Sequence, residues 1–415
     1  MGIKNLHKLL KKHCPQIYEE IHISEYSFKK IAIDVSLYMC KFKAIAGDTW
    51  LTSFINLIAC LRKNEVHCVF IYDSGASLDK DAERQRRVDD RIKLEEKVCK
   101  LEECMEKYDM TNEIDQLLID LYNKSMASKS TQKRLMGKNI KKDTIDISVI
   151  RDMVKRKRGQ ILSIRTEDFD LTKKLFDILH VPYYDAPLEA ETMCSDLCKK
   201  GIVDGVMSED TDVMAYCSPV FIHNINTATG TCLRVKYEDI LEGLDINSDQ
   251  FLDLCIMCGA DYNTNIPNIG PEKSYKYIKT YFSIEKIAES LSIDVKILNH
   301  VRCRQLFKEY PRTDVVKIPY CGSPNFKMLT EFIKKNNIRS NIENLKKSFE
   351  RSTVIIFKDN EDNEDNEDNE DDKNDDKEKE NDEDKENDEK DKNDDKEKEK
   401  ENDEEKDDFI IEIDE

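Results

Sequence analysis

The chain of 415 residues is 39% hydrophobic and 37% charged, with a formal net charge of −20, and is long enough for one large domain or two ordinary ones. The acidity belongs to the C-terminal end, because residues 358–415 carry 34 acids and 11 bases (net −23), whereas the first 357 residues carry 52 and 55 (net +3). Fourteen cysteines without framework spacing, no signal peptide and no long apolar span exclude a disulfide-rich secreted protein and a membrane protein, and predict a reducing intracellular setting.

Residues 1–78 alternate between helical and strand patterns. "GIKNLHKLLKKH" and "WLTSFINLIACLRKN" space their apolar residues as helices do, whereas "KIAIDVS" and "HCVFIYD" contain the short apolar runs typical of buried strands. This alternation predicts an α/β fold with a parallel, twisted sheet flanked by helices.

Residues 79–168 change to long, charged helical stretches, which we interpret as a helical insertion. The alternation returns over residues 169–260, with helices near 169–179 and 188–200 and strand patterns in "VPYYDAP", "GIVDGVMSED", "VFIHNI" and "TCLRVKY". Further helical patterns are expected to roughly residue 350. We therefore predict one domain over residues 1–357.

Residues 358–415 form a low-complexity acidic tail with no apolar residue between Asp359 and Asp408. Such a segment cannot bury enough surface to offset its chain entropy, so we predict that it is disordered. It is either a solvating extension or a polyanion that competes with nucleic acid for the rest of the chain, and its closing "DDFIIEIDE" is a candidate docking peptide.

Acidic residues end three of the predicted strands. Asp34 ends "KIAID", Asp73 ends "CVFIYD", and Asp210 and Asp212 end "GVMSED". Ligand-binding groups of parallel sheets lie just beyond the carboxyl ends of the strands, although a single Asp there is often a helix cap. Several carboxylates close together need a cation, and oxygen ligands without His favour Mg²⁺ or Mn²⁺. The pattern indicates a phosphoesterase in which two such ions act on a phosphodiester.

Glu189 and Glu191 in "DAPLEAET" fall in the first turn of a predicted helix that Asp185 could cap and Pro187 could open. Residues two apart on a helix point in different directions, so both acids can serve one site only if it lies over the helix start. The alternative is that they only offset the helix dipole.

A basic stripe follows the second strand. Lys80, Arg84, Arg87 and Arg91 are spaced by 4, 3 and 4 residues, which places four cations on one helical face. Such a face is either solvated or placed to hold a scissile phosphate. Further basic runs, "KSTQKRLMGKNIKK" and "VKRKRGQ", suit phosphate contacts, and residues 155–158 could equally be a nuclear import signal or an exposed charged face.

Five motifs, in chain order, resemble the signature blocks of the flap endonuclease and XPG-type family of structure-specific nucleases: "MGIKNLHKLL", "IAIDVS", "YDAPLEAE", "SEDTDVMAY" and "FLDLCIMCGADYNTNIPNIGPEKS". The resemblance implies a PIN-like nuclease core, a helical arch or gateway over residues 79–168, and a helix-two-turns-helix DNA-binding region over residues 261–345. It also implies seven metal carboxylates: Asp34, Asp73, Glu189, Glu191, Asp210, Asp212 and Asp261.

By resemblance, the first four carboxylates serve mainly one Mg²⁺ ion and the last three a second, with Mn²⁺ as a substitute, while Glu209 is not a ligand. Lys80 and Arg87 align with the working Lys and Arg of the gateway helix, so we expect them to stabilise the phosphoryl transition state. The DNA contacts that we expect are Arg84, Arg91, Gly270 and Lys273.

The chain departs from the family in several places. Asn268 stands where Gly is usual and Glu272 where a base is usual, which leaves open whether the potassium ion that the family uses to hold duplex DNA binds here. The span from Asp34 to Asp73 is short, so we expect a reduced loop for wedging open a DNA junction. "RSTVIIFKD" lacks the Gln and paired aromatics of a sliding-clamp peptide, so clamp binding is not predicted.

We predict a Mg²⁺-dependent, structure-specific 5′ DNA endonuclease that hydrolyses phosphodiesters at single-strand to double-strand junctions in replication or repair. The alternatives are a bubble-cutting repair nuclease or a 5′ to 3′ exonuclease of the same family and, from another class, an inactive protein that binds DNA junctions. The expected partner is branched or flapped DNA, bound by a monomer that does not associate with membranes. We expect an intracellular, nuclear location. The bias toward Lys, Asn, Asp and Ile suits an AT-rich genome, and if that genome is viral we expect the nucleus of a host cell.

Overall fold

The computed structural model describes residues 2–75, 77–133, 145–159, 161 and 164–349, and for residues 125–133 it describes the helix without the side chains. These residues belong to a single structural unit. The predicted acidic tail at residues 358–415, the segment "RSTVIIFKD" and most of "KSTQKRLMGKNIKK" lie outside the described residues.

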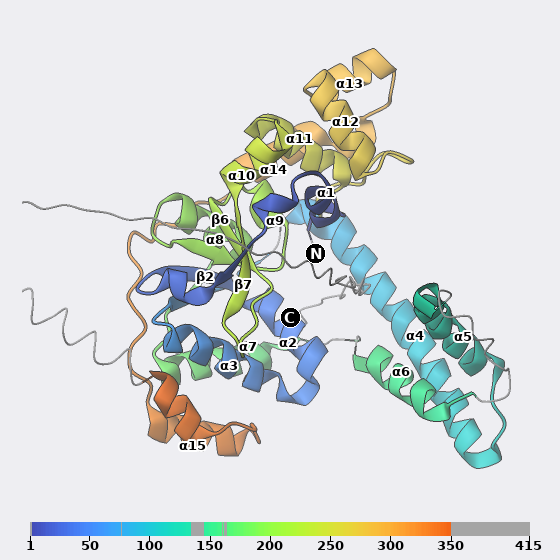
Figure 1. Cartoon of the computed structure of the whole chain (residues 1–415), viewed down its shortest axis with the longest axis vertical. Coiled ribbons are helices and arrows are strands. Elements are labelled where there is room, and N and C mark those ends of the chain that lie inside the picture. The colour runs from blue at the N-terminus through green and yellow to red at the C-terminus, as the bar shows by residue number, and fades with distance from the viewer. Residues whose placement is uncertain (1, 76, 134–144, 160, 162–163, 350–415) are drawn as a thin grey trace, which may run out of the picture. The chain divides into compact units, whose positions relative to one another are not determined.

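A seven-stranded sheet in the order β1-β7-β6-β5-β2-β3-β4 carries the helices (Figure 1). The strands are β1 Glu19–His22, β2 Lys30–Asp34, β3 His67–Tyr72, β4 Tyr183–Asp185, β5 Gly205–Met207, β6 Val220–His223 and β7 Thr231–Lys236. Strands β6, β5, β2, β3 and β4 run parallel, whereas β7 is antiparallel to β6 and β1 is antiparallel to β7. The predicted parallel sheet is confirmed for these five strands, and two antiparallel strands extend one edge.

Helices pack on both faces of the sheet. One hydrophobic core contains side chains of α2 (Val35–Ala46), α3 (Trp50–Lys63), α7 (Thr166–Leu179) and α15 (Phe326–Lys335). The other contains side chains of α1 (Leu6–His13), α8 (Ala190–Lys199), α10 (Tyr237–Leu244) and α11 (Ser248–Cys258). Alternate residues of β2 separate the cores, because Ile31 and Ile33 lie in the first and Ala32 in the second.

The segment Val35–Lys63 is 29 residues long, and its most apolar window has a mean hydropathy of 1.4, so it is long and apolar enough to cross a membrane. This differs from the expectation of no long apolar span. In the structure η3 (Gly47–Thr49) divides the segment into α2 and α3, and buried side chains such as Phe54 belong to the core. Its apolar residues therefore form the interior, and the three-residue η3 agrees with the reduced loop expected here.

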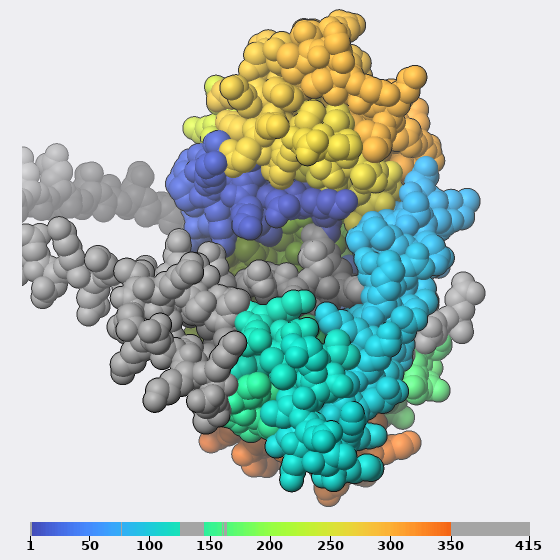
Figure 2. All heavy atoms as spheres, turned by 90° about the vertical axis from the view of Figure 1, so that its right-hand side faces the viewer, coloured from blue at the N-terminus to red at the C-terminus, as the bar shows by residue number. Residues whose placement is uncertain are grey.

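The helical insertion consists of η4 (Leu78–Lys80), α4 (Asp81–Thr111), α5 (Gln116–Lys133) and α6 (Ile147–Gly159) (Figures 1 and 2). Its far end has a small hydrophobic core of its own, in which Leu101 and Met105 of α4 pack with Leu118 of α5 and Ile150 of α6. The predicted insertion is therefore a long helix whose second half is stabilised by two shorter ones.

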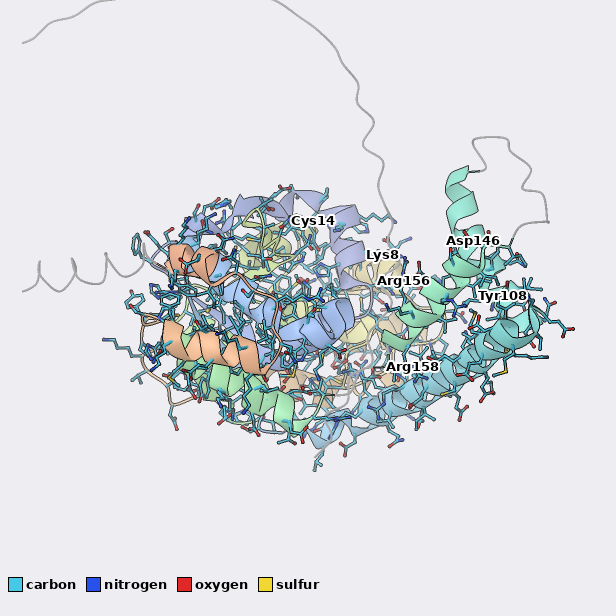
Figure 3. All side chains as sticks on the ribbon, turned by 90° about the horizontal axis from the view of Figure 1, so that it is seen from below. Lys8, Cys14, Tyr108, Asp146, Arg156 and Arg158 are labelled. Carbon is cyan, nitrogen blue, oxygen red and sulfur yellow. The ribbon has the colours of Figure 1, made fainter. Side chains whose placement is uncertain are left out.

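Ion pairs also join α6 to α4. Arg151 Nη2 lies 2.7 Å from Asp109 Oδ1, and Arg158 Nε donates to Glu102 Oε1 at 2.9 Å. Figure 3 labels Arg158 on α6, beside α4. Within the basic run of α6, residues 155–156 are exposed, whereas Arg158 is half-buried at α4. The last base of this run therefore serves the packing of the insertion.

The C-terminal helices are α12 (Pro271–Tyr281), α13 (Ile284–Leu291) and α14 (His300–Lys308), followed by α15. Residues 259–270 join α11 to α12 and contain turns at 261–262 and 267–268. This is the helix-two-turns-helix arrangement expected from the resemblance, although its first helix begins at Ser248, before the predicted boundary at residue 261. The remaining short elements are η1 Pro15–Ile17, η2 Ile23–Tyr26, α9 Asp212–Ala215 and η6 Lys296–Leu298.

Phe176 of α7 is fully buried, and its ring stacks on Phe70 of β3 with 4.1 Å between the ring centroids. Phe176→Ala should lower the free energy of unfolding by about 3–5 kcal/mol, because it leaves a cavity between helix and sheet. Urea denaturation followed by circular dichroism measures the loss. Phe28→Ala is the control, because Phe28 is 49% exposed and should cost under about 1 kcal/mol. Equal losses in the two variants would contradict this packing argument.

Candidate active site

Three neighbouring strands bring four acids to one edge of the sheet. Strands β5, β2 and β3 are adjacent and parallel, so their carboxyl ends lie together. Asp34 is the last residue of β2, Asp73 follows β3, and Asp210 and Asp212 follow β5. Because Asp34 pairs with Ile71 in the register of β2 and β3, Asp73 continues the same edge.

Three further acids reach this edge from α8 and from the turn after α11. Lys80 Nζ lies 3.1 Å from Glu189 Oε1, 2.7 Å from Glu191 Oε1 and 4.0 Å from Asp261 Oδ2. Arg87 Nη2 donates to Asp261 Oδ1 at 2.8 Å. Three of the seven acids predicted as ligands therefore contact two cationic side chains of the insertion. The other four interact electrostatically within the same group of charges.

The start of α8 differs from the prediction. The helix begins at Ala190 with Glu189 as its N-cap residue, so Glu191 lies in the first turn. Asp185 does not cap this helix, because it ends β4 and pairs with Lys173 at 3.1 Å. The two Glu residues can face one site because that site lies over the helix start.

Hydrogen bonds fix two of the strand-ending carboxylates. Asp34 Oδ1 accepts from Leu37 N at 3.1 Å and thereby caps α2. Asp73 accepts from Ser36 Oγ at 2.6 Å and from Ala190 N at 2.7 Å. For Asp34, the helix cap and the site acid are therefore one and the same residue, and the first residues of α2 and α8 orient the neighbouring carboxylate.

The buried charges shift one another's pKa values. Burial raises the pKa of Asp212, and the carboxylates of Asp210 and Asp261 raise it further. Burial alone would lower the pKa of Lys80, but Glu191 and the other groups around it outweigh burial and hold that pKa well above its usual value. Lys80, which is 9% exposed, is therefore a protonated cation among the acids.

The chemistry of this site fits hard divalent cations. Both carboxylate oxygens of Asp212 are buried without a hydrogen-bond partner. A Cβ at Gly2 would lie 2.0 Å from Asp210 Oδ1 and 2.7 Å from Asp212 Oδ1, so only glycine fits beside these oxygens. Among the described residues, no group of three His, Cys, Asp or Glu side chains is arranged to hold one metal ion. The Lys80 ammonium lies within 4.0 Å of Glu189, Glu191 and Asp261. An all-carboxylate set with unsatisfied buried oxygens nevertheless matches the ligand preference of Mg²⁺ or Mn²⁺.

Sequence reasoning missed Tyr262, the residue after Asp261. Its hydroxyl donates to Glu189 Oε2 at 3.1 Å and lies 2.5 Å from the hydroxyl of Tyr216, and its ring centroid lies 5.0 Å from Lys80 Nζ. Tyr262 therefore orients Glu189 and faces Lys80. The sequence signal that could have identified Tyr262 is its position next to the candidate ligand Asp261. That signal is weak, because buried tyrosines without a role in a site are common.

Glu209 is directed away from the cluster, although it precedes Asp210. Its Oε1 lies 2.5 Å from Lys41 Nζ and accepts from Asn224 N at 3.0 Å. This placement agrees with the expectation that Glu209 is not a ligand.

The predicted basic stripe divides in the structure. Lys80 belongs to η4, and with Arg87 it reaches the acids. Arg84 is exposed and lies 3.4 Å from Asp81 of its own helix, and Arg91 is half-buried. Two of the four cations therefore lie at the site and two lie along the helix outside it.

The turn between α11 and α12 contains two of the expected DNA contacts. Gly270 is the N-cap residue of α12, and Lys273 Nζ donates to Asn268 O at 2.9 Å. Asn268 has a φ of 63°, in the left-handed region that Gly and Asn adopt most readily. Asn can therefore stand at the position of the family's Gly without changing this turn.

Backbone carbonyls of the same turn face side-chain nitrogens. Asn265 Nδ2 lies 3.5 Å from Ile266 O and 3.3 Å from Ile269 O, in addition to the Lys273 contact with Asn268 O. A carbonyl oxygen has two lone pairs, and at these three positions the chain's own N–H groups use one of them. Lys273 and Asn265 therefore compete with any cation for these oxygens.

Comparison with known proteins places this site in a family. Residues 1–94 match the XPG N-terminal domain and residues 180–261 the XPG I-region. The chain is 34% identical over 394 residues to "Probable RAD2-like endonuclease 369L" of Invertebrate iridescent virus 6, covering 85% of this chain and 93% of that protein. It is 26% identical over 383 residues to flap endonuclease 1 of Lodderomyces elongisporus, covering 84% and 88%.

The fold agrees with these relatives. The catalytic core of Rad2 in complex with a DNA substrate has a TM-score of 0.55 at 15% identity, covering 85% of this chain and 100% of that one. The two matched regions, residues 1–94 and 180–261, contain all seven clustered acids and both cations that contact them. The chain belongs to the XPG-type, RAD2-like family of structure-specific endonucleases.

Proposed function

We propose that this endonuclease hydrolyses phosphodiesters at single-strand to double-strand junctions of branched or flapped DNA with the help of two Mg²⁺ ions. The observation that carries the proposal is the cluster of seven interacting carboxylates at the carboxyl edge of the sheet, three of which contact Lys80 or Arg87. Removal of 5′ flaps in replication or repair is the use that fits this activity best.

Each side of the acid cluster would hold one ion. We assign Asp34, Asp73, Glu189 and Glu191 mainly to one, and Asp210, Asp212 and Asp261 to the other. Bound Mg²⁺, or Mn²⁺ in its place, supplies Lewis-acid activation of water and of the scissile phosphate. The protein's own part is orientation, since Ser36 and the Ala190 N–H group hold Asp73, and Tyr262 holds Glu189.

Lys80 and Arg87 are the groups that we expect to stabilise negative charge on the phosphoryl oxygens. Both come from the root of the insertion, which we define as η4 and the first two turns of α4. Their nitrogens already lie within 2.8 Å of carboxylate oxygens. A cation that is held in place and shielded from water acts on a nearby phosphate more strongly than a solvated one.

Two bases of α4, one exposed and one half-buried, and a helix start near the site are the proposed DNA contacts. These are Arg84 and Arg91 of α4, with Gly270 and Lys273 at the start of α12, and such contacts provide affinity rather than sequence reading. In Figure 2, light-blue α4 borders yellow residues of the α12 region, and the dark-blue N-terminal region lies beside them. Residues 155–156 of α6 add two further exposed bases.

A bubble-cutting repair nuclease or a 5′ to 3′ exonuclease of the same family is the second candidate. The observation that favours it is the three-residue η3 between α2 and α3, which leaves little loop to wedge open a junction. An inactive junction-binding protein would be expected to have lost acids of the cluster, whereas all seven positions are acidic here.

We propose that the protein acts as a monomer in the nucleus, which is a host nucleus if the chain is viral. Viral and fungal endonucleases among the relatives support an intracellular DNA substrate. Binding to a sliding clamp or to a membrane is not part of the proposal.

Asp210→Ala should slow Mg²⁺-dependent cleavage of a 5′-flap DNA by about 10³-fold or more, because it removes a proposed ligand, while most DNA affinity remains. Glu209→Ala is the matched control, because the Glu209 carboxylate pairs with Lys41 outside the cluster. This variant should lose far less of the cleavage rate. Single-turnover cleavage of labelled DNA and fluorescence anisotropy in Ca²⁺ measure the two quantities. Full activity of Asp210→Ala, or equal losses in both variants, would contradict the assignment.

The preferred DNA structure can be identified by comparing the rates at which the protein cleaves 5′-flap, bubble, gapped and blunt duplex DNA. We expect the 5′ flap to be cut fastest, in Mg²⁺ and in Mn²⁺, because the acids and the gateway cations suit a phosphate at a junction. Fastest cutting of a bubble, or degradation from a duplex end, would instead support the second candidate. Absence of cleavage on all four substrates would overturn the proposed activity.

The affinity for duplex DNA should not depend on potassium, because Asn265 and Lys273 already donate to the turn carbonyls. Replacing KCl by NaCl or LiCl at constant ionic strength should change the dissociation constant by less than about twofold. Asn265→Ala should weaken binding to the same extent in all three salts. Tighter binding by the unmodified protein in KCl alone would show that the turn does take up the ion.

A further inference from the structure

A bidentate ion pair joins the root of the insertion to the C-terminal helices. Arg302 of α14 donates from Nε to Asp79 Oδ1 at 3.0 Å and from Nη2 to Asp79 Oδ2 at 2.8 Å. The two residues are 223 positions apart in the sequence. Paired N–H groups of Arg on both oxygens of a carboxylate fix direction as well as distance.

Asp79 is itself held in one orientation. Ser77 Oγ donates to Asp79 Oδ2 at 3.2 Å and is also 3.2 Å from Asp79 N, so the side chain of Ser77 caps η4. Asp79 directly precedes Lys80, whose ammonium lies 2.7 Å from Glu191. A displacement of Asp79 would therefore move Lys80 with it.

Arg302 projects from a helix that ion-pair and aromatic contacts attach to residues next to the site. In α14, Arg304 donates to Asp253 of α11 at 2.6 and 2.7 Å. Phe307 of the same helix packs against Tyr262, with 5.2 Å between the ring centroids. Since the Tyr262 ring also faces Lys80, α14 reaches the neighbourhood of Lys80 by two routes.

Stability is a poor explanation for this pair. The side chains of Arg302 and Asp79 are 49% and 27% exposed, and ion pairs with that exposure contribute little to folding. What the pair does provide is a fixed distance between α14 and the first turn of the insertion.

We propose that Asp79 and Arg302 are positioning residues, which hold η4 against α14 and thereby place the Lys80 ammonium for the reaction. The inference rests on the proposed function, in which Lys80 stabilises the phosphoryl group. It also links the helix-two-turns-helix region to the reaction centre, because α14 packs on α11 of that region.

Loss of the pair should slow the chemical step and leave substrate binding unchanged, because neither side chain is among the proposed DNA contacts. Asp79→Asn and Arg302→Gln should each lower the single-turnover rate on a preferred DNA substrate by about two- to fivefold. The double variant should be no slower than either single one, since one interaction is removed in all three. The dissociation constant for the DNA and the melting temperature should stay at the values of the unmodified protein.

The Lys80→Ala variant distinguishes a positioning role of Asp79 from a purely structural one. If Asp79 acts through Lys80, adding Asp79→Asn to Lys80→Ala should cause no further loss of rate. Arg151→Gln is the matched control, because Arg151 makes the same kind of paired contact with Asp109 at the far end of α4, at 3.2 and 2.7 Å. This control should retain the full rate.

Three results would overturn the inference: an unchanged rate for Asp79→Asn, a further loss in the Lys80→Ala background, or an equal loss in Arg151→Gln. Each of them requires that the unmodified protein cleaves DNA. Failure of the unmodified protein to cleave any substrate would instead overturn the proposed function on which the inference rests.

Discussion

Repulsion between buried carboxylates is the constraint on which the rest of this structure depends. Two like charges about 4 Å apart repel by about 4 kcal/mol at the effective dielectric of about 20 that suits protein sites. Burial raises the pKa of Asp34 and Asp212, and neighbouring carboxylates raise both further. The acids can share one edge only where positive charge shares it too. Lys80 and Arg87 supply part of that charge from the protein itself, at 2.7 and 2.8 Å from carboxylate oxygens.

This requirement explains where the insertion leaves the sheet. It departs after β3 and returns through α7 to the neighbouring edge strand β4, so its first residues pass over the carboxyl edge where the acids lie. Its two tasks are separated along α4. The root carries Lys80 and Arg87, whereas the stretch from Val98 onward packs with α5 and α6 in a separate core. The far half can therefore differ in length between relatives without displacing the cations at the root.

The strand-ending acids could be predicted because a short apolar run followed by Asp marks the carboxyl end of a buried strand, and parallel strands share that end. Glu189, Glu191 and Asp261 could not be placed in this way, since their pattern says only that they lie next to helices. The contacts of Lys80 with Glu191 and of Tyr262 with Glu189 join residues 111 and 73 positions apart, which no local pattern encodes. Strand β1 escapes prediction because "EEIH" is short and polar, and its pairing with β7 depends on the backbone of its partner.

Glu272, which stands where the family has a base, has its charge balanced by another helix. Its Oε2 lies 3.0 Å from Lys12 Nζ and 3.0 Å from His13 Nε2, both at the end of α1. Hydrogen bonds from His13 and Lys12 hold the pKa of Glu272 below its usual value, so the carboxylate remains charged. Because α1 packs against α12, the bases of α1 stand next to the start of α12 but are partly neutralised there. The proposed phosphate contact at this helix start would therefore depend more on the backbone N–H groups of α12 than on a row of bases.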